Sequence, residues 1–102
     1  LFLFFTFHGV IKYSIWEGLR MYNNKDYKVA IQYLERVVTF YPKSIGKFHI
    51  LLGKMYLDTG YINEAKKHAN IAYSINPEHK APKDLINSIQ LFEKNKINIK
   101  KK

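Results

Sequence analysis

The amino-acid sequence predicts an all-α protein in which two helical hairpins are followed by a closing helix. The first indication is an internal repeat, in which small residues and a helix-stopping proline recur at an offset of 35 residues. The matched positions are Gly18 and Gly53, Ala30 and Ala65, and Pro42 and Pro77. The second indication is the recurrence of apolar residues at helical spacing within each repeat. With 102 residues, 47% of them hydrophobic, the chain has material for one packed domain.

The stretch from His49 to Pro77 shows the hairpin pattern most clearly. Small residues stand where two helices must approach closely, and large apolar residues surround them. These small residues are Gly53, Ala65, Ala69 and Ala72. Gly60 suits a left-handed helix end between the two helices, and Pro77 stops the second helix. Residues 45–79 are therefore predicted to form one complete hairpin.

The spacing of this stretch is similar to the tetratricopeptide repeat (TPR) pattern of 34 residues. The matching positions are His49, Leu52, Gly53, Tyr56, Ala65, Ala69 and Pro77, with His49 in a slot that the family fills with an aromatic residue. The resemblance implies a right-handed α-solenoid of two TPR-like hairpins plus a C-terminal capping helix. It also implies a scaffold that binds other proteins, without naming a partner.

Residues 11–44 are predicted to form the first repeat, and their second half fits the pattern well. Asp26 is expected to cap its second helix. The predicted buried stripe of that helix consists of Ala30, Leu34, Val37 and Val38. Residues 43–45 are expected to link the repeats.

The first half of this repeat departs from the family pattern. Ser14 stands at the aromatic slot, Glu17 at the leucine slot and Lys25 at the bend glycine. Tyr13 and Trp16 are expected to supply the missing bulk, through a first helix that is shifted along the chain.

Residues 80–94 are predicted to form the capping helix. Pro82 suits its first turn, and apolar residues recur at helical spacing at Leu85, Ile86, Ile89 and Phe92. Ser88, which lies 35 residues after Gly53, is expected to occupy a close-contact position. Residues 95–102 are expected to form a frayed basic tail.

Residues 1–10 form an almost wholly apolar segment that is too short to span a bilayer alone, since a span needs about 20 residues. Two interpretations stay open. The segment is either the end of a truncated membrane or signal segment, with Lys12 as its flank, or an apolar cap that packs on the solenoid. The localisation therefore stays open between cytoplasmic and membrane-tethered.

The formal net charge of +9 is concentrated at the C-terminus. Residues 94–102 contain five lysines and no acid, which leaves +4 on residues 1–93, with 12 basic against 8 acidic residues. Such a tail can bind nucleic acid or an anionic membrane surface in a salt-sensitive way. Nucleic acid is disfavoured, because the tail has no arginine or aromatic residue to read or stack on bases.

The sequence offers no basis for catalysis or for a bound cofactor. It contains no nucleophile elbow, phosphate-binding glycine loop or zinc-protease motif, and no cysteine. His68 and Glu64 are spaced as neighbours on a helix, which is more often a solvated surface contact than a metal site. We therefore expect neither enzyme activity nor a metal.

The resemblance places a partner-binding groove on the first helix of each hairpin. In the first repeat its residues are Lys12, Ile15, Leu19, Tyr22 and Asn23. In the second they are Lys47, Ile50, Lys54, Leu57 and Asp58, and the capping helix would add Leu85, Ile89 and Phe92. Lysines alternate with apolar residues, which suits a protein or peptide of mixed acidic and apolar character. The alternative is that these lysines only solubilise the helices and that the aliphatic residues pack inside.

The sequence thus favours a protein-interaction scaffold that binds a peptide or assembles with other subunits, including copies of itself. Two other functions stay open. One is anchoring through the basic tail. The other is a purely structural role as an internal piece of a longer repeat array, because two and a half repeats are few for a stable solenoid.

Overall fold

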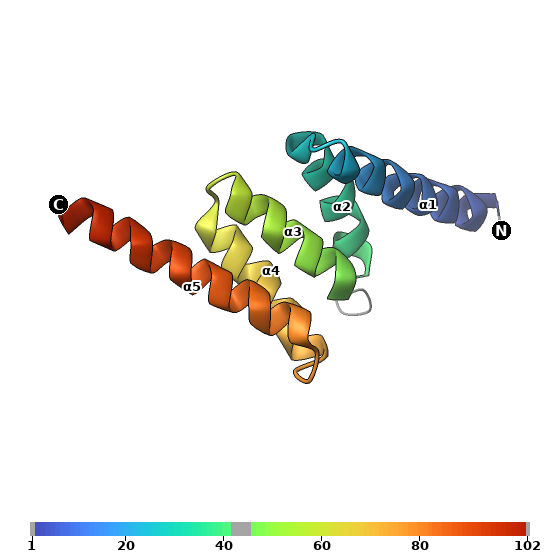
Figure 1. Ribbon diagram of the computed structural model, residues 1–102. Helices are drawn as coiled ribbons and strands as arrows, with labels where there is room; N and C mark the ends of the chain where they lie inside the picture. Colours follow the sequence, from blue (N-terminus) through green and yellow to red (C-terminus); the bar gives the residue numbers. More distant parts are fainter. Residues whose placement is uncertain (1, 42–45, 102) are drawn as a thin grey trace. The chain divides into compact units, whose positions relative to one another are not determined.

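The chain is helical throughout the part that the structure describes. The computed structural model describes residues 2–41 and 46–101, with the side chains of residues 9–41 and 46–96. Its helices are α1 (Phe2–Asn23), α2 (Tyr27–Phe40), α3 (Gly46–Asp58), α4 (Ile62–Ile75) and α5 (Lys80–Lys101) (Figure 1). No strand occurs among the described residues. The predicted all-α fold is confirmed.

The helices belong to two compact units, one within residues 1–45 and one within residues 46–102. In the first unit α1 packs against α2. In the second α3 packs against α4, and α5 packs on both. Two hairpins and a closing helix are thus present, as the sequence predicts.

A tight turn joins α1 to α2. Lys25 has a left-handed backbone with φ of +64°, which ends the helix. The N–H of Lys25 donates to the carbonyl of Tyr22 (3.0 Å), and the N–H of Asp26 donates to the carbonyl of Met21 (2.9 Å). This pair of bonds is the Schellman motif, which satisfies carbonyls that the end of the helix would otherwise leave unpaired.

The turn between α3 and α4 repeats the same bonds 35 residues later. Gly60 has φ of +89°, as predicted for a left-handed helix end. Its N–H donates to the carbonyl of Leu57 (3.2 Å), and the N–H of Tyr61 donates to the carbonyl of Tyr56 (2.8 Å). The rings of Tyr56 and Tyr61 meet edge to face at 6.2 Å, which supplies the apolar contact that often accompanies this motif.

Small residues and aliphatic side chains build the interior of the second unit. Its buried cluster consists of Ile50, Ala65, Ala69, Ala72, Leu85 and Ile89. Gly53 lies so close to α5 that an added Cβ would stand 2.6 Å from Leu85 Cδ2. In the first unit the stripe predicted on α2 is buried as expected.

The first hairpin contains its predicted first helix, α1. The prediction that this helix is shifted along the chain relative to the repeat pattern is wrong. Ser14 and Glu17 are buried and stand 35 residues before the buried His49 and Leu52. Trp16 is 64% exposed and Tyr13 is 53% exposed, so neither fills the interior. The reason is geometric, because two residues before Gly18 the helix has turned about 200° away from the packed side.

Other local predictions also need correction. Asp26 occupies the position before α2, but its side chain makes no capping hydrogen bond. Ser88 is exposed and donates to the carbonyl of Asp84 (3.0 Å), so it does not occupy the predicted close-contact position. Pro42 and the linker residues 43–45 lie outside the described residues.

The terminal segments that the structure describes are parts of α1 and α5. Residues 2–10 belong to α1, whereas the side chains of residues 1–8 lie outside the described part, so the two interpretations of this segment stay open. At the other end α5 runs to Lys101, so the predicted frayed tail is wrong. No glycine or proline follows Pro82, and lysine favours helices. Within the described residues no helix is long and apolar enough to cross a membrane.

The two turns predict stability changes of opposite sign. Lys25→Gly should raise the free energy of unfolding by about 1 kcal/mol, because glycine adopts a left-handed backbone without steric cost. Gly60→Lys should lower it by about the same amount. Urea denaturation of both variants measures these values, and changes of the same sign would contradict the equivalence of the turns.

Helices α1 and α2 approach closely at Gly18, which predicts that Gly18→Ala destabilises the protein. The new Cβ would lie 2.7 Å from Leu34 Cδ2, 2.9 Å from Leu34 Cγ and 3.3 Å from Tyr33 Cβ. We expect a loss of about 1–3 kcal/mol of unfolding free energy from overpacking. Gly9→Ala is the control, since nothing lies within 4 Å of its added Cβ, and it should gain up to about 1 kcal/mol from helix propensity. Equal effects at the two glycines would contradict the predicted packing.

Candidate interaction surface

Helix α3 places its predicted groove residues in two different environments. Lys47, Lys54 and Asp58 are exposed, and Leu57 is half-buried. Ile50 is only 9% exposed and belongs to the core of the second unit. For Ile50 the structure therefore supports the packing alternative that the sequence left open.

The same division holds on α5. Leu85 and Ile89 are buried in the core, 3% and 2% exposed. Phe92 is 40% exposed and lies beyond this core. Of the three residues proposed for the capping helix, only Phe92 presents a large exposed apolar surface.

A hollow of about 410 Å³ forms where the exposed part of α5 meets the end of α3. It is lined by Leu57, Asp58, Ser88, Leu91, Phe92 and Asn95. Leu91 is 59% exposed, so this hollow offers two apolar side chains from α5 beside Leu57 of α3. The structure thus brings together Leu57, Asp58 and Phe92 from the predicted set.

The beginning of α3 borders a second hollow of about 220 Å³. It is lined by Gly46, Lys47, Ile50, Ala72, Ile75, Asn76, His79 and Pro82. Lys47 therefore stands beside one hollow, while Leu57 and Asp58 line the other, almost three helical turns further along α3.

The groove residues predicted on α1 lie in the first unit. Lys12 and Asn23 are exposed there. Ile15, Leu19 and Tyr22 are half-buried, and the ring of Tyr22 stacks on that of Tyr27 at 5.8 Å. This part of the predicted set therefore offers side chains of mixed polar and apolar character.

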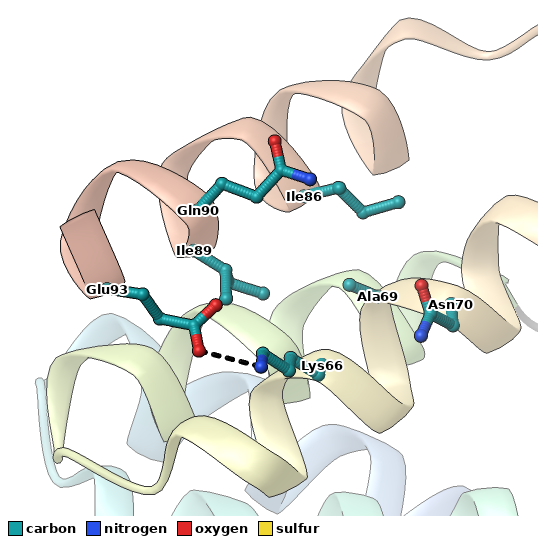
Figure 2. A pocket seen from close by; sticks show the side chains of 7 residues that line it. All are labelled: Lys66, Ala69, Asn70, Ile86, Ile89, Gln90 and Glu93. Carbon is teal, nitrogen blue, oxygen red and sulfur yellow. Dashed lines mark ion pairs between the residues drawn. The ribbon is translucent and has the colours of Figure 1, made fainter.

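Sequence reasoning missed a hollow of about 230 Å³ between α4 and α5 (Figure 2). Ala69, Ile86 and Ile89 supply its apolar lining, and Asn70 and Gln90 carry amides there. Figure 2 shows the ion pair at one side, in which Lys66 Nζ lies 2.7 Å from Glu93 Oε2. Both side chains are more than a third exposed, so this pair contributes little to stability.

A buried histidine pair joins α3 to α4. Nδ1 of His49 lies 2.9 Å from Nδ1 of His68, so one ring donates and the other accepts. Tyr56 stacks on His68 with 5.6 Å between ring centroids and an angle of 9°. His68 is 2% exposed, so the solvated contact predicted for it is wrong. Its spacing from Glu64 gave no signal of burial, whereas its helical register with Ala65 and Ala72 could have given one.

These observations define the class of the protein as an α-helical repeat protein built from antiparallel helix pairs. A comparison with protein families agrees, because residues 46–79 match the model described as tetratricopeptide repeat. This segment comprises α3, α4 and the turn after α4, so the hairpin of the second unit is similar to a tetratricopeptide repeat. Comparisons with curated proteins and with solved structures find no match. The repeat supports a general role as a protein-interaction scaffold.

The histidine pair predicts energetic coupling between α3 and α4. His49→Phe or His68→Phe alone should each cost about 1–3 kcal/mol, because the nitrogen that pairs with the remaining ring is lost. The double variant should cost less than the sum, with a coupling of about 0.5–3 kcal/mol. A double-mutant cycle in urea measures this, and strictly additive values would contradict the pairing.

Proposed function

We propose that the chain is an interaction scaffold that binds a peptide of mixed acidic and apolar character along α3 and α5. The observation that carries this proposal is the hollow lined by Leu57, Leu91 and Phe92 beside a helix with two exposed lysines. Apolar anchors that fill such hollows supply most of the affinity of a typical interface. An apolar side chain of the bound peptide would fill this hollow and supply most of the affinity.

The lysines of α3 give this surface its preference for acidic partners. Lys47 and Lys54 are seven residues apart, so they lie on one side of the helix about 10 Å apart along its axis. Both are exposed. Their attraction would steer an acidic segment and fix its direction, while the hollow holds an apolar side chain. Asp58 at the hollow would disfavour a carboxylate at that point.

Helix α5 supports the alternative function through its basic end. It continues to Lys101, and Lys94 and Lys96 are exposed on it. A helix that presents lysines can bind an anionic membrane surface, with an affinity that falls steeply with salt. This alternative makes residues 94–102 necessary for binding and the lysines of α3 dispensable.

The proposal is tested with peptides selected from a random displayed library against the full chain. Selected peptides should carry acidic and apolar residues. Their affinity, measured by fluorescence anisotropy, should fall about tenfold or more in Lys47→Glu/Lys54→Glu and in Leu57→Ala/Phe92→Ala.

The matched control is Lys28→Glu/Lys67→Glu, which changes the net charge equally at exposed positions of α2 and α4. It should leave peptide affinity within about twofold, apart from long-range screening effects. Selected peptides that bind the α3 variant as tightly as the parent chain would overturn the proposal. Binding to anionic vesicles that disappears on deletion of residues 94–102, with no peptide selected, would favour the alternative.

A further inference from the structure

Helix α1 carries a stripe of exposed side chains that the groove does not use. Tyr13, Trp16 and Arg20 are spaced by three and four residues, so they lie on one side of the helix. Tyr13 is 53% exposed, Trp16 is 64% exposed and the side chain of Arg20 is 49% exposed. Trp16 is the sole tryptophan of the chain.

Helix α2 extends this stripe with Tyr33 and Arg36. The rings of Tyr13 and Tyr33 meet edge to face at 6.0 Å, and a hydrogen bond to Tyr33 raises the pKa of Tyr13. The guanidinium of Arg36 lies 5.6 Å from the centre of the Tyr33 ring. We call these residues, Tyr13, Trp16, Arg20, Tyr33 and Arg36, the aromatic–arginine patch.

Both arginines of the patch are held in place. Nε and Nη2 of Arg20 donate to the two carboxylate oxygens of Glu17 at 3.1 and 3.0 Å, and its guanidinium lies 5.7 Å from the Trp16 ring centre. Nη1 of Arg36 donates to the buried hydroxyl of Ser14 at 3.3 Å. Surface side chains fixed in this way lose little conformational entropy on binding.

The use of arginine is selective. The chain has 17 basic residues, of which Arg20 and Arg36 alone are arginines, and both belong to the patch. Arginine retains several N–H donors after one carboxylate is bound, and it stacks on aromatic rings, which lysine does less well. Tryptophan, tyrosine and arginine are the residues that most often dominate protein interfaces.

In the second repeat, the residues at the equivalent positions of the first helix are mostly buried. The positions 35 residues further on are Phe48, Leu51 and Met55. Phe48 is 7% exposed and Met55 is fully buried. The equivalent side of α1 combines exposed rings with cations instead, which indicates a face for a separate, charged partner.

We propose that the aromatic–arginine patch docks an acidic amphipathic helix. The apolar side chains of the partner would pack on Trp16 and Tyr13, and its carboxylates would meet the outward N–H groups of Arg20 and Arg36. From Tyr13 to Arg20 the stripe is about 10 Å long, which matches two turns of a partner helix.

Charge selects this occupant over a second copy of the chain. The acidic residue Glu17 touches the patch, and Arg20 already engages both of its carboxylate oxygens. A symmetric dimer through the patch would oppose arginine to arginine in a chain of net charge +9, which like-charge repulsion disfavours. An acidic helix removes that repulsion and supplies acceptors.

The test uses the fluorescence of Trp16, the single tryptophan, in the full chain. The probes are two synthetic helical peptides with the same leucine stripe, one flanked by glutamates and the other by lysines. The acidic peptide should shift Trp16 emission to the blue and protect it from acrylamide, whereas the basic peptide should not. Equal shifts with both peptides, or none with the acidic one, would overturn the proposal.

Variants locate the binding. The affinity for the labelled acidic peptide should fall about tenfold or more in Trp16→Ala and in Arg20→Gln/Arg36→Gln. Trp16→Phe, which keeps an aromatic surface, should stay within about threefold of the parent, and circular dichroism checks the fold of each variant. Tyr73→Ala, at a 41% exposed tyrosine of α4, is the matched control and should bind like the parent.

Two further results separate this proposal from the others. The Lys47→Glu/Lys54→Glu variant should still bind the acidic peptide at Trp16, because those lysines belong to the other unit. Loss of the Trp16 shift in that variant would instead assign the peptide to the proposed groove and overturn the patch. A blue shift that follows the concentration of the chain alone would show self-association and also overturn it.

Discussion

The reversal of the chain after α1 and after α3 is the constraint on which each hairpin depends. One left-handed residue, Lys25 or Gly60, ends the first helix. The two hydrogen bonds of the Schellman motif then fix the direction of the second helix. Helices of 13 or 14 residues are marginal alone. The reversal lets α3 and α4 bury a shared face of small residues, and α5 closes that face with Leu85 and Ile89.

The repeat, the helices and most of the core could be predicted because their signals are local. An offset of 35 residues aligns glycines and alanines, which close helix packing explains, and prolines, which end helices. The environment of Trp16 could not be predicted from size, because helical register outweighs bulk and turns its ring outward. The burial of His68 also depends on a partner nineteen residues earlier in the chain. Part of the candidate site was predicted, since Leu57 and Phe92 do line one hollow, whereas Ile50 lies in the core.

The two proposed surfaces use different chemistry for related partners. The hollow between α3 and α5 offers a concave apolar surface beside lysines, whose side chains are flexible and strongly hydrated. Such a surface suits electrostatic steering of a partner with modest specificity. The aromatic–arginine patch offers flat rings and arginines that are already fixed by Glu17 and Ser14, which suits a rigid partner. The two surfaces belong to different compact units of the chain.

Nuclear magnetic resonance of the backbone around Lys25 and Gly60 tests most directly whether the chain reverses at these two residues. We expect a positive φ at both residues, slow amide exchange at Asp26 and Tyr61, and nuclear Overhauser contacts between α1 and α2 and between α3 and α4. Uninterrupted helical contacts through residues 23–27, with Lys25 in the right-handed region, would contradict this expectation. The first unit would then be one long helix without a hairpin, and the patch shared by α1 and α2 would not exist.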